Sequence, residues 1–243
     1  MNAIITGAAQ GMGKVFAEEL ASLGHNVAIC DIKKEKIKEV KTSIEKKYDV
    51  KVIAEQVDVS DEENVKNFIS NVKRNFNSIH ILINNAAIHP LHSIEEISSE
   101  EWDWVLNVNL KGYFFFVREI LPDMKKERFG RIINIASEAG KNGGTICALH
   151  YAASKGGVLG FTRNLAKQVG EYGITVNAIA PGRIATDMTA DVGKGNQIYI
   201  EKSAVKRLGE PQDVAYVVSF LVSTRSGFIT GETINVNGGT LMD

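Results

Sequence analysis

Residues 2–13 read Asn-Ala-Ile-Ile-Thr-Gly-Ala-Ala-Gln-Gly-Met-Gly, and the fold that the sequence predicts is built outward from them. The apolar run from Asn2 to Thr6 is typical of a short buried strand, and a helical apolar pattern begins directly after Gly13. The glycines between these elements let the backbone approach a pyrophosphate closely, and the helix N-terminus supplies N–H donors. The stretch therefore indicates a phosphate-binding turn. Its spacing, GxxxGxG, differs from GxGxxG, and a purely structural turn is the alternative reading.

Strand and helix patterns alternate along the rest of the chain. Strands are expected at residues 2–6, 26–30, 50–57, 79–83, 131–136, 175–180 and 233–236, and helices include residues 35–47 and 102–126. Gly24 is expected to end the first helix, and Ser60 or Asp61 to cap the helix after the third strand. The alternation predicts an α/β fold with a doubly wound, seven-stranded parallel sheet and helices on both faces. Four prolines and no low-complexity linker favour a single domain over residues 1–243.

Residue types suited to ligand binding follow several of these strands. In a doubly wound sheet, ligands bind outside the carboxyl ends of the strands. The second strand ends at Asp31, about 20 residues beyond the glycine turn, where a carboxylate can bind both hydroxyls of an adenine ribose. The alternative role of Asp31 is to cap the next helix. Asp58 lies at the end of the third strand, where it can contact the edge of an adenine. The residues at the strand ends are Gly7, Asp31, Asn84, Ser137 and Pro181.

Composition excludes several function classes. The formal net charge of −1 gives no basic face for nucleic acid or an anionic membrane. No apolar run reaches membrane-spanning length, and the chain enters its first strand with no signal peptide before it. The two cysteines, Cys30 and Cys147, form neither a disulfide framework nor a metal-ligand pattern. We expect a cytoplasmic protein with a small-molecule substrate, no bound metal, and no nucleic-acid or membrane partner.

Tyr151 and Lys155 are the candidate acid/base pair. Residues four apart on a helix lie on one face, so both side chains can point into the same space. A nearby cation favours the phenolate and is expected to lower the pKa of the tyrosine toward neutrality. A half-buried tyrosine beside a solvated lysine is the alternative. Asn109 stands in an otherwise apolar stretch and must either brace the backbone or hold a water near the reaction centre.

These motifs, taken in order, resemble the single-domain short-chain dehydrogenase/reductase family over essentially the whole chain. The resemblance implies a Rossmann-type fold, a nicotinamide cofactor and a homotetramer that packs through helices near residues 113–125 and 151–169. Two departures are Ala87, where the family commonly has glycine, and a longer loop expected to bulge at residues 142–144. The matching motifs are Thr6-Gly7-x-x-x-Gly11-x-Gly13, Asp58-Val59, Asn84-Asn85-Ala86, Asn109, Ser137, Tyr151-x-x-x-Lys155, and Pro181-Gly182 with Thr186.

The resemblance also implies roles for these residues. Tyr151 would act as general acid/base, Lys155 would lower its pKa and hold the nicotinamide ribose, and Ser137 would bind the carbonyl oxygen. Asn109 would complete a proton path through a water. The cofactor site would comprise Gly7, Gln10, Gly11, Met12, Gly13, Asp31, Asp58, Val59, Asn85, Ala86, Tyr151, Lys155, Pro181, Gly182, Ile184 and Thr186. We expect NAD rather than NADP, since Asp31 would repel a 2′-phosphate, although Lys14 and Lys33 would soften that repulsion.

Three functions are compatible with the sequence. The favoured one is an NAD-dependent dehydrogenase of a small secondary alcohol or ketone, such as a polyol, sugar or hydroxy acid. The second is a 3-oxoacyl-[acyl-carrier-protein] reductase, against which Gln10 and Tyr172 stand where such enzymes often carry basic residues, although Arg128 could serve in docking. The third is a catalytically silent nucleotide-binding protein. The complete set of catalytic residue types argues against the third.

Arg183 is the candidate substrate-binding residue. It follows Pro181-Gly182, where a guanidinium can reach the substrate and bind a carboxylate, sulfonate or phosphate. His89 and His150 are expected to add positive charge to the same region. The alternative is an arginine that points to water or pairs with Asp187. The polar segment 189–202 is expected to form a mobile cover over the site.

Overall fold

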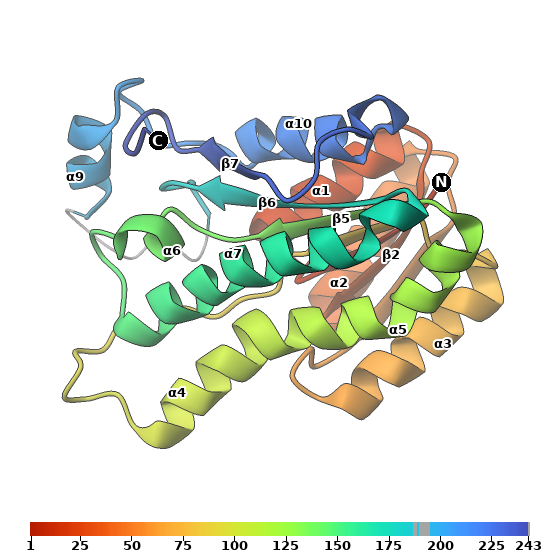
Figure 1. Ribbon diagram of the computed structural model, residues 1–243, viewed down its shortest axis with the longest axis horizontal. Coiled ribbons are helices and arrows are strands. Elements are labelled where there is room, and N and C mark those ends of the chain that lie inside the picture. Colours follow the sequence, from red (N-terminus) through yellow and green to blue (C-terminus); the bar gives the residue numbers. More distant parts are fainter. Residues whose placement is uncertain (187–188, 190–194, 243) are drawn as a thin grey trace.

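The computed structural model describes residues 1–186, 189 and 195–242 and contains a seven-stranded parallel sheet (Figure 1). The strand order is β3-β2-β1-β4-β5-β6-β7, so the chain starts in the middle, winds to one edge and returns to build the other. The predicted doubly wound α/β fold is confirmed. The strands are β1 (Asn2–Thr6), β2 (Asn26–Asp31), β3 (Val52–Gln56), β4 (Ile81–Asn84), β5 (Gly130–Ile135), β6 (Ile174–Pro181) and β7 (Thr233–Val236).

Each strand begins and ends within two residues of its predicted bounds. β1 and β7 have the expected bounds, whereas β3 begins two residues late, at Val52. The backbone N–H of Val50 donates to the carbonyl of Tyr48 at 3.0 Å, and that of Lys51 donates to the side chain of Asn26 at 2.9 Å. Residues 50 and 51 therefore form a turn, which the apolar side chain of Val50 concealed in the sequence.

Helices cover both faces of the sheet (Figure 1). One face carries α1 (Gly11–Ser22), α2 (Lys34–Lys47) and α10 (Pro211–Val222). The other carries α3 (Glu62–Phe76), α5 (Gly112–Glu127) and α7 (Leu149–Val169). The shorter helical elements are α4 (Ser99–Leu106), the π-helical turn η1 (Asn107–Lys111), α6 (Ala139–Asn142), η2 (Gly170–Tyr172), α9 (Gly195–Lys202) and η3 (Thr224–Ser226).

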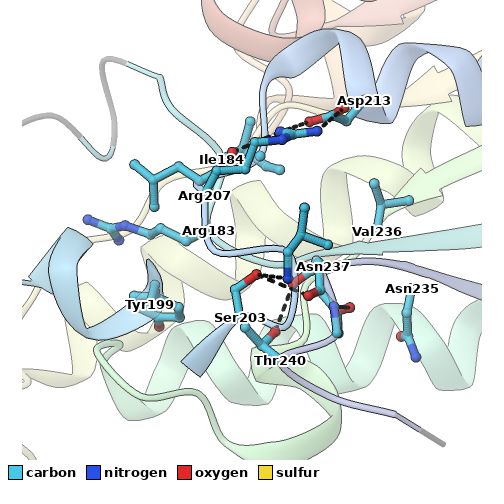
Figure 2. Close-up of a pocket in the computed structure, with 15 residues that line it drawn as sticks. Arg183, Ile184, Tyr199, Ser203, Arg207, Asp213, Asn235, Val236, Asn237 and Thr240 are labelled. Atoms are coloured by element: carbon cyan, nitrogen blue, oxygen red, sulfur yellow. Dashed lines mark hydrogen bonds and ion pairs between the residues drawn. The ribbon is translucent and has the colours of Figure 1, made fainter. Parts of the chain in front are cut away.

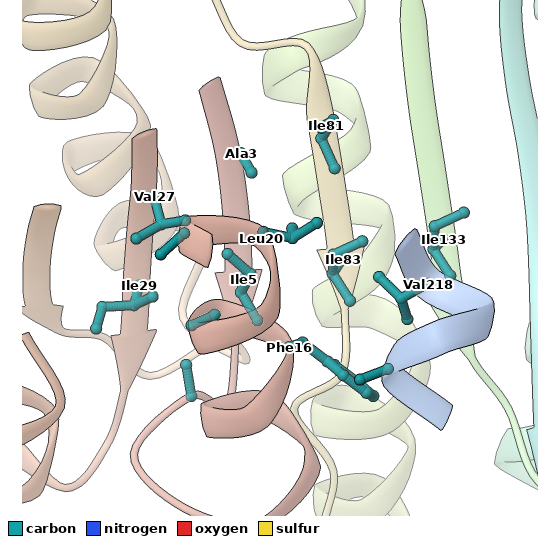
Figure 3. Close-up of a cluster of buried hydrophobic side chains, with 14 of the residues drawn as sticks. Ala3, Ile5, Phe16, Leu20, Val27, Ile29, Ile81, Ile83, Ile133 and Val218 are labelled. Atoms are coloured by element: carbon teal, nitrogen blue, oxygen red, sulfur yellow. The ribbon is translucent and has the colours of Figure 1, made fainter. Parts of the chain in front are cut away.

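Two apolar layers fix the helices on the sheet. Figure 3 shows the first, in which Phe16 of α1 and Val218 of α10 lie against side chains of the strands such as Ile5 and Ile83. All four side chains are fully buried. Burial of each stabilises the fold by about 1.5–3 kcal/mol, so this layer holds the N-terminal end of α1 in a fixed position beside β1.

The helix boundaries follow local signals. Gly24 has φ +78° and its N–H donates to Ala21 O at 3.0 Å, which confirms the predicted end of α1. Of the two expected caps for α3, Asp61 is the one used, since its carboxylate accepts from the N–H groups of Glu63 and Asn64. α10 was not predicted, although the sequence signal was present in Pro211 at its first position.

The helix expected at residues 102–126 contains a π-helical turn. α4 and α5 are joined by η1, which inserts an extra residue into the helical ladder. Asn109 lies in this turn and is fully buried. The turn directs its amide toward the loop after β4, which matters for the site described below.

Two loops border the carboxyl ends of β5 and β6. Gly143 and Gly144 have φ values of +82° and +76°, so the loop before α7 turns at the predicted position. Within the segment 189–202, expected to be a mobile cover, residues 190–194 lie outside the described residues, and residues 195–202 form α9. In the described part of the chain, no helix is long and apolar enough to cross a membrane.

Candidate active site

A cavity of about 90 Å³ lies at the carboxyl ends of β5 and β6, beside the N-terminal turns of α1 and α7. It brings together residues from distant parts of the sequence. The predicted site residues that line it are Met12, His89, Ser137, Tyr151, Pro181, Gly182, Arg183, Ile184 and Thr186. Of the five residues expected at the strand ends, Ser137 and Pro181 line this cavity, whereas Gly7, Asp31 and Asn84 are not among its lining residues.

Tyr151 and Ser137 face each other in this cavity. Ala148 precedes α7 in an extended conformation, which places Tyr151 in the first turn of the helix, opposite the end of β5. The hydroxyl of Ser137 is hydrogen-bonded to the phenol of Tyr151, which favours the phenolate. Burial has the larger effect and raises the pKa of Tyr151 to about 12. The lowering of the Tyr151 pKa that was expected from the sequence is therefore wrong.

The position and charge of Lys155 explain why the pKa of Tyr151 is not lowered. Its Nζ atom donates to the carbonyl oxygen of Ile135 at 2.7 Å and to the phenol oxygen of Tyr113 at 3.4 Å, and it lies 5.8 Å from the ring centre of Tyr151. Burial lowers the pKa of Lys155 to about 7. The amine is thus only partly charged near neutrality, and it is directed mainly at a backbone carbonyl.

Asn109 braces the backbone, which was one of the two roles left open. Its Oδ1 accepts from Ile88 N at 2.8 Å, and its Nδ2 donates to Ile88 O at 3.0 Å and to Ser154 Oγ at 3.1 Å. Ser154 Oγ in turn donates to the carbonyl of Tyr151 at 2.7 Å. Asn109 therefore ties the loop after β4 to the helix that carries Tyr151 and Lys155.

The glycine turn after β1 can hold the pyrophosphate of a dinucleotide. Gly7 has φ +65°, and a Cβ atom there would lie 2.8 Å from Ala86 Cα. At Gly13, a Cβ atom would lie 2.2 Å from Gly7 O, so only glycine fits at this position of the turn. Gln10, which precedes α1, makes no side-chain capping bond, and the first turn of the helix contains no acid. The N-terminal N–H groups of α1 are therefore available to an anion, and the cradle fits a pyrophosphate.

Asp31 lies directly beside this turn. Its carboxylate accepts from Ala9 N and from Lys33 N, both at 3.0 Å. The helix after it is preceded by Lys33 rather than by Asp31, so the expected capping role reduces to one bond in the turn before α2. Gln10 Oε1 accepts from the amines of Lys33 at 2.7 Å and Lys36 at 3.1 Å, so Gln10 binds two of the three lysines that closely follow Asp31.

Three further predicted cofactor positions, Asp58, Val59 and Asn85, differ in their contacts. Asp58 is exposed, and its Oδ1 accepts from the N–H and the hydroxyl of Ser60 at 2.9 and 2.6 Å. Val59 packs against Gly112, where a Cβ atom would lie 2.8 Å from Val59 O. Asn85 connects β4 to the glycine turn, since its Nδ2 donates to Thr6 O at 2.9 Å and Gly7 O at 3.1 Å.

The histidines differ from the prediction. The ring of His89 lies against that of Tyr151, with centres 4.1 Å apart. Burial and the nearby Arg183 lower the pKa of His89 to about 4, so the positive charge expected there is wrong. His150 Nε2 is bonded to Glu101 Oε1 at 2.7 Å, and His150 is not among the residues that line the cavity. It connects α7 to α4 instead of facing the substrate.

Arg183 reaches from the end of β6 toward α9, as Figure 2 shows. Its Nε donates to Asn196 Oδ1 at 2.9 Å and its Nη2 to Thr189 O at 3.1 Å, while its guanidinium lies 5.5 Å from the ring centre of Tyr199. Arg183 and Tyr199 line both the catalytic cavity and a second cavity of about 420 Å³ (Figure 2). Asp187, its alternative partner, lies outside the described residues.

Several residues of the catalytic cavity were missed by sequence reasoning. Tyr199 is buried, and its phenol oxygen accepts from Ile146 N at 3.4 Å. Cys147 Sγ donates to Gly143 O at 3.0 Å, and burial raises the pKa of this thiol. Neither position follows a strand, which was the signal used, so only the tertiary packing brings them here. Among residues 1–186, 189 and 195–242, no group of three or more His, Cys, Asp or Glu side chains could hold a metal ion.

A Rossmann-like sheet, a dinucleotide cradle and a Ser–Tyr–Lys cluster define an oxidoreductase that uses a nicotinamide cofactor and acts on CH–OH or C=O groups. The chain belongs to the short-chain dehydrogenase/reductase family. Residues 7–240 match the family described as Enoyl-(Acyl carrier protein) reductase.

Known proteins agree with this assignment over the full chain. The chain is 39% identical over 243 residues to the 3-oxoacyl-[acyl-carrier-protein] reductase FabG of Staphylococcus epidermidis, covering 99% of each. It is 39% identical over 237 residues to that of Aquifex aeolicus, covering 97% of this chain and 95% of the relative. A crystal structure of the Brucella melitensis 3-oxoacyl-[acyl-carrier protein] reductase has a TM-score of 0.94 at 37% identity, covering 100% of this chain and 91% of that one. A second one from that organism, with bound NAD, has a TM-score of 0.93 at 36% identity.

Proposed function

We propose that the chain interconverts 3-oxoacyl and 3-hydroxyacyl groups with NAD(H). The observation that carries this proposal is the hydrogen-bonded pair of Ser137 and Tyr151, in a cavity that also contains Met12 and Thr186 from the two sides expected to hold the cofactor. The relatives support the 3-oxoacyl group as the substrate class. They favour this reading over the polyol or sugar dehydrogenase that the sequence alone suggested.

In the proposed reaction, the nicotinamide supplies the hydride that reduces the carbonyl carbon. The carbonyl oxygen accepts hydrogen bonds from Ser137 and Tyr151, and Tyr151 transfers its proton as the alkoxide forms. The raised pKa of Tyr151 suits this direction, because the phenol is fully protonated at neutral pH. Lys155 donates a hydrogen bond to Ile135 O and so fixes the position of the end of β5, at the floor of the cavity.

We propose NAD(H) as the preferred cofactor. The carboxylate of Asp31 is fixed by two backbone N–H groups and keeps lone pairs for ribose hydroxyls. A 2′-phosphate at this position would meet a fixed negative charge. The amines of Lys33 and Lys36 each use one of their three N–H donors on the side-chain oxygen of Gln10.

Acyl-carrier-protein docking has one candidate surface. Arg128 donates to Glu171 O at 2.7 Å, and the Lys125 amine lies 4.5 Å from the ring centre of Tyr172. This surface lies at the amino ends of β5 and β6, while Tyr151 acts at their carboxyl ends, about 20 Å away for a six-residue strand.

The quaternary structure belongs to the same proposal. Trp104 of α4 and Phe114 of α5 are exposed on one helical surface, and Tyr216 and Phe220 of α10 are exposed on the other face of the sheet. Two apolar surfaces on opposite faces suit a homotetramer built from two kinds of two-fold contact. Light scattering after gel filtration tests it. We further propose that residues 1–243 form one domain located in the cytoplasm.

The test of the function is a reductase assay with matched 3-oxoacyl substrates. The same 3-oxobutyryl group is offered as the acyl-carrier-protein thioester, as the N-acetylcysteamine thioester and as the methyl ester, each with NADH and with NADPH. We expect turnover of the 3-oxo group with NADH preferred, and polyols and sugars as poor substrates in the reverse direction. No turnover of any 3-oxoacyl compound would overturn the proposal.

A further inference from the structure

The catalytic cavity contains two polar groups that hydride transfer to a ketone does not use. One is Nε2 of His89, which is buried and has no hydrogen-bond partner within the described part of the chain. Buried polar atoms are nearly always paired, because an unpaired one costs about 1–3 kcal/mol. The ring of His89 lies directly on that of Tyr151. Nε2 is therefore a buried, unpaired polar group on a ring that lines the cavity beside Tyr151.

The second group is the guanidinium of Arg183. An arginine has five N–H donors, and the bonds to Asn196 and Thr189 use only Nε and one N–H of Nη2. None of the carboxylates in residues 1–186, 189 and 195–242 forms an ion pair with it. The positive charge is half-buried beside Tyr151, and its bonds to the described residues leave N–H donors for an anion.

His89 and Arg183 act on the same part of the cavity. Each lines it together with Tyr151, and the charge of Arg183 contributes to keeping His89 neutral. A neutral histidine with its proton on Nε2 donates one hydrogen bond. His89 as a neutral donor and Arg183 as a cation can together bind a carboxylate.

The distance between this pair and the reacting carbonyl limits the substrate. In a 3-oxo carboxylate, two C–C bonds of about 1.5 Å separate the carbonyl carbon from the carboxyl carbon, so the two groups lie about 2.5 Å apart. The His89 ring packs against that of Tyr151, with ring centres 4.1 Å apart and planes tilted by 36°, so a carboxylate bound beside His89 would be a neighbour of the carbonyl bound at the phenol.

We propose that Arg183 and His89 form a carboxylate subsite, so that short 3-oxo and 3-hydroxy carboxylic acids are substrates as free acids. The inference rests on the proposed function, since the same 3-oxo group is reduced. The C–H bond forms at C3 from the hydride of NADH, which is oxidised to NAD⁺. The C=O π electrons take the proton of Tyr151, which is replaced from solvent. The carboxylate is unchanged and only positions the substrate.

The test compares acetoacetate with its methyl ester, which has the same 3-oxo group without the charge. We expect wild type to prefer the acid by at least about tenfold in kcat/KM. Arg183→Met should lower kcat/KM for the acid by about 100-fold and for the ester by less than about threefold, because a charge-assisted contact is lost. His89→Phe keeps the ring stacked on Tyr151 and should lower the value for the acid alone, by about tenfold. Arg183→Lys should restore part of the preference.

The control variant is Asn196→Ala, which removes a partner of Arg183 but not its charge. We expect it to change both substrates equally and slightly. An equal loss on acid and ester with Arg183→Met would overturn the subsite and assign Arg183 to holding Thr189 and Asn196 in place.

A binding measurement separates this inference from the proposed function. Calorimetric titration of acetoacetate into the enzyme with NAD⁺ forms a complex that cannot react, so it reports the subsite whether or not turnover occurs. We expect binding to wild type and about 100-fold weaker binding to Arg183→Met. If the ester is reduced but the acid neither binds nor reacts better, the subsite is wrong and the function stands. If neither these two compounds nor the two 3-oxobutyryl thioesters are reduced, the proposed function fails, and the titration alone decides the subsite.

Discussion

The Nζ atom of Lys155 donates to the carbonyl oxygen of Ile135 at 2.7 Å, at the last residue of β5. The contact links the catalytic helix α7 to the strand that leads into Ser137. Because Lys155 is only 1% exposed, its charge is costly, and its pKa falls from 10.5 to about 7.

This pKa predicts a pH dependence of stability. Between pH 7 and about 10.5, the unfolded chain holds a proton on Lys155 that the folded chain has lost, so the lysine makes stability rise with pH across this window. Lys155→Met keeps the length of the side chain and removes the titration. In thermal denaturation from pH 7 to 9.5, the difference in Tm, wild type minus Lys155→Met, should increase steadily. A difference that stays flat would contradict the low pKa.

The hydrogen bonds of the Asn109 side chain predict an effect on the stability of the fold. Asn109→Leu leaves the N–H and C=O of Ile88 without their partners, and the free energy of unfolding should fall by about 2–4 kcal/mol. Denaturant unfolding measures this directly. Asn107→Leu, in the same π-helical turn, is the matched control, because the structure records no side-chain hydrogen bond for Asn107 among the described residues. Equal losses in the two variants would contradict the bracing role.

Asp31 predicts the choice between cofactors. Asp31→Asn removes the negative charge and keeps an oxygen for one of the two backbone N–H groups, so the ratio of kcat/KM for NADH over NADPH should fall by about 10- to 100-fold. Asp49→Asn, an exposed carboxylate beyond α2, is the control and should leave the ratio unchanged. If Asp31→Asn retains the wild-type ratio, the preference arises elsewhere.

The sequence predicted the sheet and the cradle because their signals are local. The run from Asn2 to Thr6 and the glycines after it require one conformation, and the positive φ of Gly7 and Gly11 agrees with it. The end of α1 at Gly24 and the cap at Asp61 followed from the same kind of signal. Short-range sterics and hydrogen bonding decide these features, so a single sequence is sufficient to predict them.

The electrostatics of the site were beyond the reach of the sequence. Spacing alone placed Tyr151 and Lys155 on one side of a helix, but the pKa of each depends on how deeply both are buried. The same holds for His89, which burial keeps neutral, and for His150, whose partner Glu101 lies 49 residues away. Such values follow from tertiary packing, which no local pattern encodes.

The most direct test of the account is the effect of Tyr151→Phe on reduction of the 3-oxobutyryl N-acetylcysteamine thioester by NADH. The variant keeps the aromatic ring against His89 and removes only the hydroxyl that donates the proton. We predict that turnover falls by about 10²–10⁴-fold, while the affinity for NADH, measured by fluorescence, changes by less than about threefold. Turnover close to that of wild type, with NADH bound normally, would contradict the assignment of Tyr151 as the general acid.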